Sequence, residues 1–127
     1  MLTYVSAFSG FSVDDITKAR EFYGTTLGLA VEQTPEGLRL TLAGGASVFI
    51  YPKPNHVPAT FTALNFVVKD IDAAAEELQA AGVQLERYDV GEMVADEKGI
   101  YRATSATDGP SIAWFKDPAG NILSILR

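Results

Sequence analysis

The feature of this sequence that most limits its fold is an internal repeat. The first copy contains Val13-Asp14-Asp15-Ile16, Ala19, Leu27-Gly28-Leu29 and Glu32. The second copy contains Val68-Lys69-Asp70-Ile71, Ala74, Ala81-Gly82-Val83 and Glu86. The offset between the copies is 55 residues at the start and 54 at the end. Because matched positions at a nearly constant offset are hard to attribute to coincidence, the chain is expected to contain two similar modules, about 1–55 and 60–127.

Each copy begins with a strand pattern followed by a helix pattern. Residues 8–13 and 63–68 alternate between apolar and other side chains, which predicts strands. Residues 15–27 and 70–81 have apolar side chains at helical spacing, which predicts helices. Asp15 and Asp70 suit the helix starts, where a carboxylate accepts backbone N–H groups, and Gly28 and Gly82 suit the ends.

Short strands are predicted after each helix. They cover residues 29–34, 38–42 and 47–51 in the first module and 83–88, 100–104, 111–116 and 121–126 in the second. Residues 91–99 fit no strand and are expected to form a loop, and residues 52–58, which contain three prolines, are expected to link the modules.

Composition narrows the function classes. A chain of 127 residues with 47% hydrophobic and 20% charged residues is expected to fold as one globular domain, 1–127. No apolar run is long enough for a membrane span, and the start lacks the features of a secretory signal, so a cytoplasmic protein is expected. The net charge of −6 argues against nucleic acid as a partner. The absence of cysteine excludes thiolate chemistry.

Two motifs carry a resemblance to a known family. They are Phe11-Ser12-Val13-Asp14-Asp15, followed by Glu21-Phe22-Tyr23 and Leu27-Gly28-Leu29, and the ending Phe115-Lys116-Asp117-Pro118-Ala119-Gly120-Asn121. With them the chain resembles the vicinal-oxygen-chelate superfamily, of the glyoxalase, bleomycin-resistance and extradiol-dioxygenase type, over nearly its whole length. The resemblance implies an α+β fold in which tandem βαβββ modules form a cupped mixed sheet with helices on the outside. It also implies a small-molecule ligand inside the cup and a homodimer.

Strand alternation separates the two faces of the sheets. Six apolar side chains are expected to pack on the helices: Phe11, Val13, Leu64, Phe66, Val68 and Phe115. The neighbouring residues are expected to face the cup: Phe8, Gly10, Ser12, Ala63, Asn65, Val67 and Trp114.

The metal positions of the family are occupied by residues that bind metal poorly. In the resemblance, metal-using relatives place His, Gln or Glu on the first and last strand of each module. The corresponding residues here are Phe8 and Ala63 on the first strands, Ser124 on the last strand of the second module, and Tyr51, or Phe49 in a shifted register, in the first. Since none offers an imidazole or carboxylate, we expect no metal and no cofactor.

The candidate ligand-binding residues are aromatic or neutral: Phe8, Ser12, Tyr51, Ala63, Asn65, Tyr101, Trp114 and Ser124. For the aromatic residues among them, simple core packing is the alternative. His56 is the only histidine, and its place in the linker favours an exposed residue over a general base. The acidic residues Glu92, Asp96 and Glu97 are interpreted as part of a solvated loop rather than a cation site.

Three functions remain open. The leading hypothesis is a metal-free protein that holds a small molecule in the cup, for resistance or sequestration. The second is an enzyme without metal, an isomerase or lyase that uses Tyr51, Tyr101, Asn65 or Glu92 for proton transfer. The third is a metal-dependent glyoxalase-like lyase with ligands from unexpected positions. Whether any reaction is catalysed is left open by the sequence.

Overall fold

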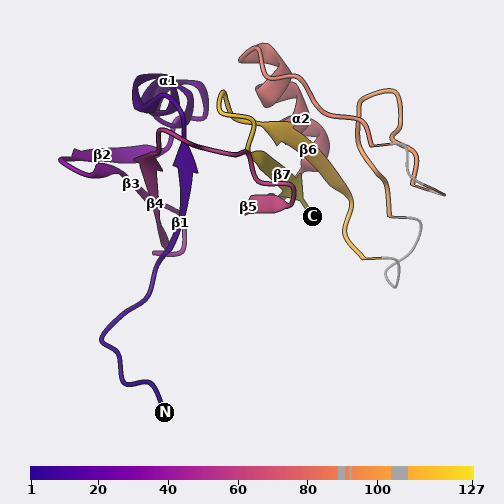
Figure 1. Cartoon of the computed structure of the whole chain (residues 1–127). Helices are drawn as coiled ribbons and strands as arrows, with labels where there is room; N and C mark the ends of the chain where they lie inside the picture. The colour runs from indigo at the N-terminus through magenta and orange to yellow at the C-terminus, as the bar shows by residue number, and fades with distance from the viewer. Residues whose placement is uncertain (89–90, 92, 104–108) are drawn as a thin grey trace. The chain divides into compact units, whose positions relative to one another are not determined.

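The computed structural model describes residues 1–88, 91, 93–103 and 109–127 (Figure 1). The chain divides into two compact units, which we call unit 1 (Met1–Pro58) and unit 2 (Ala59–Arg127). Each unit contains a helix and a mixed sheet, which confirms the predicted α+β class.

Unit 1 is built on a four-stranded sheet. Its strands are β1 (Ser9–Val13), β2 (Ala30–Thr34), β3 (Gly37–Thr41) and β4 (Ser47–Pro52), and their order is β1-β4-β3-β2. β1 runs parallel to β4, and the other two pairs are antiparallel. The predicted strands of the first module are therefore confirmed within about two residues.

The helical segment of unit 1 contains a change of helix type. α1 (Ile16–Glu21) begins at Asp15, whose carboxylate accepts hydrogen bonds from the backbone N–H groups of Thr17 and Lys18 at 3.0 and 3.1 Å. It continues directly as a π-helical turn, η1 (Phe22–Thr26). The predicted helix is thus confirmed in extent, but its last part is wider than an α-helix.

Unit 2 has a smaller sheet. Its regular strands are β5 (Thr62–Val67), β6 (Ile112–Lys116) and β7 (Ile122–Leu126), in the order β5-β7-β6. β5 is parallel to β7, and β6 is antiparallel to β7. This arrangement matches the β1-β4-β3 part of unit 1, as the repeat predicts.

The helix of unit 2, α2 (Ile71–Ala80), has the predicted ends. Asp70 accepts a hydrogen bond from the backbone N–H of Ala73 at 3.0 Å. After the helix, Gly82 has a φ of 86°, a left-handed conformation that glycine adopts without the penalty other residues incur.

The prediction of two further strands after α2 is wrong for the described residues. The segment 83–88 forms only an isolated bridge, Glu86 with Trp114, and the segment 100–104 forms only the bridge of Tyr101 with Ile112. Thr104 lies outside the described residues. Both segments have the alternation of a strand, but each pairs with β6 through a single residue, so no ladder of hydrogen bonds forms.

Helix-facing side chains form the cores of the two units. In unit 1, α1 contacts β3 and β4, and the Phe11 ring lies 6.2 Å from the ring of Tyr23, which is fully buried. In unit 2, α2 contacts β7, and the rings of Phe66 and Phe115 stack at 6.5 Å. The opposite face of each sheet is not covered by the helix of its own unit, and we call it the open face.

A buried turn joins β6 to β7 and explains the second sequence motif. The carboxylate of Asp117 accepts hydrogen bonds from the backbone N–H groups of Ala119 and Asn121 at 3.0 and 2.8 Å, and from Asn121 Nδ2 at 3.0 Å. Asn121 Oδ1 accepts a bond from the backbone N–H of Ala59 at 3.2 Å. The motif therefore fixes the hairpin that carries Trp114 and Ser124.

Candidate functional site

The open face of unit 1 carries a row of aromatic rings. Phe8, just before β1, meets Phe49 of β4 edge-on at 6.4 Å, and Phe49 stacks on Tyr51 at 6.3 Å with 17° between the ring planes. Phe8 is 68% exposed and Tyr51 38% exposed, so the row is accessible from one side. A cavity of about 460 Å³ beside it is lined by Phe8, Phe49, Arg39 and Glu36, among others.

Ser12 and His56 lie together at the other end of this open face. Ser12 is the register partner of Tyr51, and its Oγ lies 2.7 Å from Nδ1 of His56. The interpretation of His56 as an exposed linker residue is therefore wrong: the side chain is partly buried and bonded to β1. The sequence could not show this, because the contact joins residues 44 positions apart.

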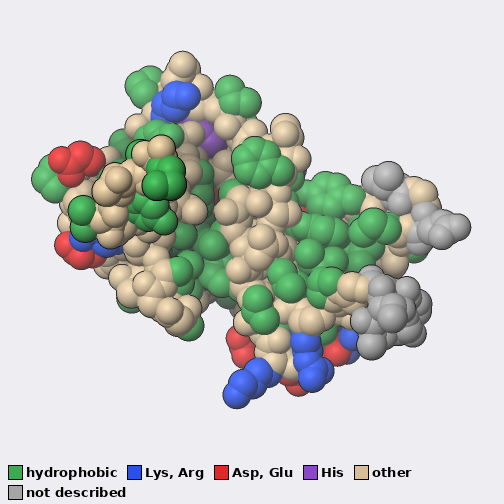
Figure 2. Space-filling view, turned by 90° about the horizontal axis from the view of Figure 1, so that it is seen from below, with side chains coloured by type: hydrophobic (Ala, Val, Ile, Leu, Met, Phe, Trp, Pro, Cys, Tyr) green, Lys and Arg blue, Asp and Glu red, His purple; other side chains and the backbone are tan. Residues whose placement is uncertain are grey.

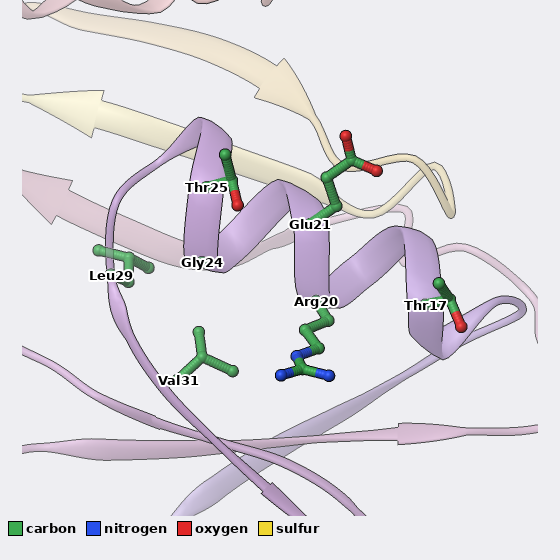
Figure 3. Close-up of a pocket in the computed structure, with 7 residues that line it drawn as sticks. All are labelled: Thr17, Arg20, Glu21, Gly24, Thr25, Leu29 and Val31. Atoms are coloured by element: carbon green, nitrogen blue, oxygen red, sulfur yellow. The ribbon is translucent and has the colours of Figure 1, made fainter.

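A second cavity of unit 1, of about 470 Å³, lies between the helical segment and β2 (Figure 3). Its walls include Thr17, Arg20, Glu21, Leu29 and Val31, and none of the predicted ligand-binding residues. Arg20 already donates a hydrogen bond to Gln33 Oε1 at 2.7 Å. The cavity is mostly polar and lies away from the open face.

Trp114 is the centre of an aromatic cluster in unit 2. Its ring meets Tyr101 at 5.1 Å and Tyr88 at 5.8 Å, both edge-on, and its Nε1 donates a hydrogen bond to Thr62 Oγ1 at 3.0 Å. Tyr101 is buried behind Trp114, and its hydroxyl accepts a hydrogen bond from the backbone N–H of Tyr88.

A pocket of about 300 Å³ opens beside this cluster. Its walls include Phe61, Thr62, Tyr88, Met93, Trp114 and Ile122. Hydrophobic side chains gather on the face of unit 2 shown in Figure 2. Sequence reasoning selected Trp114 but missed Phe61, Tyr88 and Met93. Tyr88 has the strand parity of Glu86, but the pairing of Glu86 with Trp114 is visible only in the structure.

The predicted position of Ala63 is changed by a β-bulge. The register of β5 on β7 shifts between Thr62 and Leu64, so Ala63 has no register partner and Thr62 is paired with Ile122. Thr62 therefore bonds to Trp114 on the open face, where simple alternation had placed Ala63. A bulge leaves no mark in a single sequence when its neighbours are ordinary strand residues.

Asn65 and Ser124 form a polar pair on the same open face. Ser124 is the register partner of both Asn65 and Trp114, and its hydroxyl donates a hydrogen bond to Asn65 Oδ1 at 2.5 Å. Ser124 is fully buried, whereas Asn65 is exposed. Of the eight predicted ligand-binding residues, the structure brings Trp114, Tyr101, Asn65 and Ser124 together in unit 2, and Phe8, Tyr51 and Ser12 on the open face of unit 1.

Register identifies the residue of β4 that corresponds to Ser124. Asn65 pairs with Ser124, and Gly10, which corresponds to Asn65 at the repeat offset, pairs with Phe49. The equivalent residue is therefore Phe49, the alternative to Tyr51. The four family positions thus carry Phe8, Phe49, Ser124 and, because of the bulge, Thr62 in place of Ala63. They offer two hydroxyls and no imidazole or carboxylate. These donors do not fit a divalent metal.

A cluster of ion pairs lies at the start of α2. Asp72 at the start of α2 forms ion pairs with Arg102 at 2.6 Å and Lys98 at 3.1 Å, and Arg102 also pairs with Asp96 at 2.9 Å. Hydrogen bonds from Arg102, and then from Lys98, hold the pKa of the Asp72 carboxyl well below its usual range. The expected solvated acidic loop is thus partly ordered by ion pairs, and Glu92 lies outside the described residues.

Over the described residues, no three His, Cys, Asp or Glu side chains lie close enough to hold a metal ion. In the same part of the chain, no helix combines the length and apolar character of a membrane span.

Two α+β modules, each with its helix on one face of a mixed sheet and its other face open, define a glyoxalase-type fold. The chain belongs to the Glyoxalase/Bleomycin resistance protein/Dioxygenase superfamily, whose family model matches residues 5–125. No curated protein matches the chain.

Several solved structures share the fold. The fosfomycin resistance protein FosX from Listeria monocytogenes is 14% identical with a TM-score of 0.70, and the match covers 99% of this chain and 93% of that one. TnmS3, an antibiotic binding protein from Streptomyces sp. CB03234, is 24% identical with a TM-score of 0.65, and 98% of each chain is covered. A glyoxalase family protein from Enterococcus faecalis is 18% identical with a TM-score of 0.68 over the whole of both chains.

Proposed function

We propose that this chain binds an apolar aromatic small molecule on the open faces of its modules, without a metal ion. The observation that carries the proposal is the pocket of about 300 Å³ beside Trp114 in unit 2. Its size is at the lower end of the range of ligand pockets, about 300–1,000 Å³, and its mixture of apolar walls with a few polar groups is typical of such sites.

The remaining candidate residues support the same class of ligand. Phe8 and Tyr51 extend an aromatic row on unit 1, and Asn65, Ser12 and Ser124 are neutral polar groups that can orient a ligand. An antibiotic binding protein and a fosfomycin resistance protein among the solved structures of this fold are in keeping with a role in resistance or sequestration.

Binding is tested by equilibrium dialysis with 1-ethylnaphthalene, a flat hydrocarbon probe. Trp114→Ala should weaken binding by tenfold or more, because it removes the largest wall of the pocket. Leu29→Ala, which widens the separate cavity of Figure 3, is the matched control and should leave binding unchanged. Equal binding by a well-folded Trp114→Ala variant would contradict the proposal.

Metal independence is tested separately. Elemental analysis of the dialysed protein should give far less than one zinc, nickel or iron per chain, and probe binding should be the same with and without EDTA. One tightly held metal per chain would refute this part of the proposal.

We also propose that two chains pair as a homodimer through the segment before β1. Residues 1–8 form no helix or strand, and Leu2, Tyr4 and Val5 are 83%, 68% and 103% exposed. Burying such side chains against a second copy is favourable in water. Sedimentation should show a dimer that Val5→Asp weakens and the control Thr3→Asp does not. A wild-type chain that sediments as a monomer at high concentration would exclude pairing.

The cytoplasmic location expected from the sequence stays a prediction.

A further inference from the structure

The hydroxyl of Tyr88 is an unsatisfied polar group of unit 2. The oxygen is shielded from solvent and, in the structure as described, has no hydrogen-bond partner. Buried hydroxyls in folded proteins almost always have a partner, and an exception indicates a missing water or ligand. Tyr88 therefore requires a polar atom that the described residues do not supply.

Tyr88 belongs to the wall of the pocket beside Trp114. Its ring meets Trp114 edge-on, and its backbone N–H donates to the hydroxyl of Tyr101, which anchors the residue. Trp114 Nε1 is already bonded to Thr62 Oγ1 at 3.0 Å. Among the described residues of this wall, the Tyr88 hydroxyl is thus a buried polar group without a hydrogen-bond partner.

The hydroxyl is a donor at neutral pH. Burial, with a smaller contribution from the carboxylate of Glu86, raises the pKa of Tyr88 above its ordinary value. A neutral phenol in an apolar wall can donate one hydrogen bond, and it needs an acceptor to do so. Since an ionised ligand would lose its hydration on entering apolar walls, an uncharged acceptor fits better.

We propose that the unit 2 pocket takes a flat aromatic molecule whose rim carries an uncharged oxygen acceptor, such as a ketone or quinone carbonyl. The Tyr88 hydroxyl, which is covered in this structure, shifts when the ligand enters and donates a hydrogen bond to this oxygen. The inference rests on the proposed aromatic binding and adds to it a chemical class of ligand. Edge-on rings at Trp114 and Tyr88 select the flat shape, and the hydroxyl selects the carbonyl.

The experiment compares two probes of nearly equal shape, 1-acetylnaphthalene and 1-ethylnaphthalene, by equilibrium dialysis. Tyr88→Phe removes only the hydroxyl. It should weaken binding of the ketone about fivefold, the usual effect of one net hydrogen bond, and leave binding of the hydrocarbon unchanged. Comparing both probes on both proteins isolates the hydrogen bond from the desolvation of the ketone. Thr25→Val, which removes a hydroxyl from the separate cavity of Figure 3, is the control and should change neither affinity.

Folding of the variant is checked by thermal unfolding, where Tyr88→Phe should match the wild type or exceed it, since the lost hydroxyl had no partner. Equal effects of Tyr88→Phe on the two probes, or no effect on either, would overturn the inference while the proposed aromatic binding stands. If the wild-type chain binds neither probe, the proposed function itself fails.

Discussion

Replacing Asp117 with alanine is expected to destabilise unit 2 by about 3 kcal/mol. Asp117 is only 5% exposed, and its carboxylate accepts hydrogen bonds from the backbone N–H groups of Ala119 and Asn121 and from Asn121 Nδ2. A hydrogen bond to a charged group contributes roughly 1.5–3 kcal/mol, and bonds that share one acceptor do not add fully. The whole domain is expected to have about 5–15 kcal/mol of stability, so the variant should still fold.

Urea denaturation followed by Trp114 fluorescence measures this effect. With a slope of roughly 1.5 kcal/mol per M, a loss of about 3 kcal/mol lowers the midpoint by about 2 M and leaves the slope unchanged. Asp14→Ala removes an exposed aspartate next to the cap of α1 and should change the free energy of unfolding by less than about 0.5 kcal/mol. Neutral surface substitutions differ in their free energy of unfolding by roughly 0.5 kcal/mol. If the free energies of unfolding of Asp117→Ala and Asp14→Ala differ by no more than this, the Asp117 turn does not stabilise the hairpin.

Three further predictions concern other parts of the chain. Ser12→Ala should lower the free energy of unfolding by about 1 kcal/mol, because the hydrogen bond to His56 is lost. The His56 Nδ1 signal in ¹⁵N NMR should also shift, and an unmoved signal would exclude the contact. Asp72→Asn should lower the free energy of unfolding at pH 7. Because the folded-state pKa of Asp72 is depressed, this loss should begin to shrink as the pH falls below the unfolded value of about 3.9, should vanish only below the folded-state pKa, and should also shrink in high salt. A loss independent of both pH and salt would rule out the ion pairs. Gly82→Ala should lower the free energy of unfolding by about 1 kcal/mol, because Gly82 has a φ of 86°. Gly24→Ala should be neutral or stabilising, because Gly24 lies inside η1 and an added Cβ would be at an ordinary contact distance of 3.6 Å from Val31. Equal thermal shifts of the two variants would contradict this.

The local features of the fold could be predicted from the sequence because each rests on neighbouring residues. Asp15 and Asp70 bond to N–H groups two or three positions later, and Gly28 and Gly82 adopt their conformations within a single turn. The strands of unit 1 also have hairpin signals between them, so their limits were nearly right.

Features that depend on distant pairing could not be predicted. The bulge at Ala63 arises from how β5 meets β7, and the contact of Ser12 with His56 joins β1 to the linker. The segment with Tyr88 has strand alternation but pairs through one residue, which depends on where β6 lies. The candidate site was therefore predicted in its centre, Trp114, and missed at its walls, Thr62 and Tyr88.

The two modules lack metal donors in different ways, and the difference bears on where a ligand would bind. At equivalent register positions, unit 2 has the hydrogen-bonded pair of Asn65 and Ser124, whereas unit 1 has Gly10 beside Phe49. A Cβ added at Gly10 would lie 3.0 Å from the carbonyl oxygen of Phe49, so this position admits no larger side chain without movement of the backbone. Placing a polar side chain such as the one of Asn65 at Gly10 would therefore require a change in β4 as well. At these register positions unit 2 thus has a polar pair beside its aromatic pocket, whereas unit 1 has a glycine and a ring. This difference supports the proposal that unit 2 binds the polar rim of the ligand.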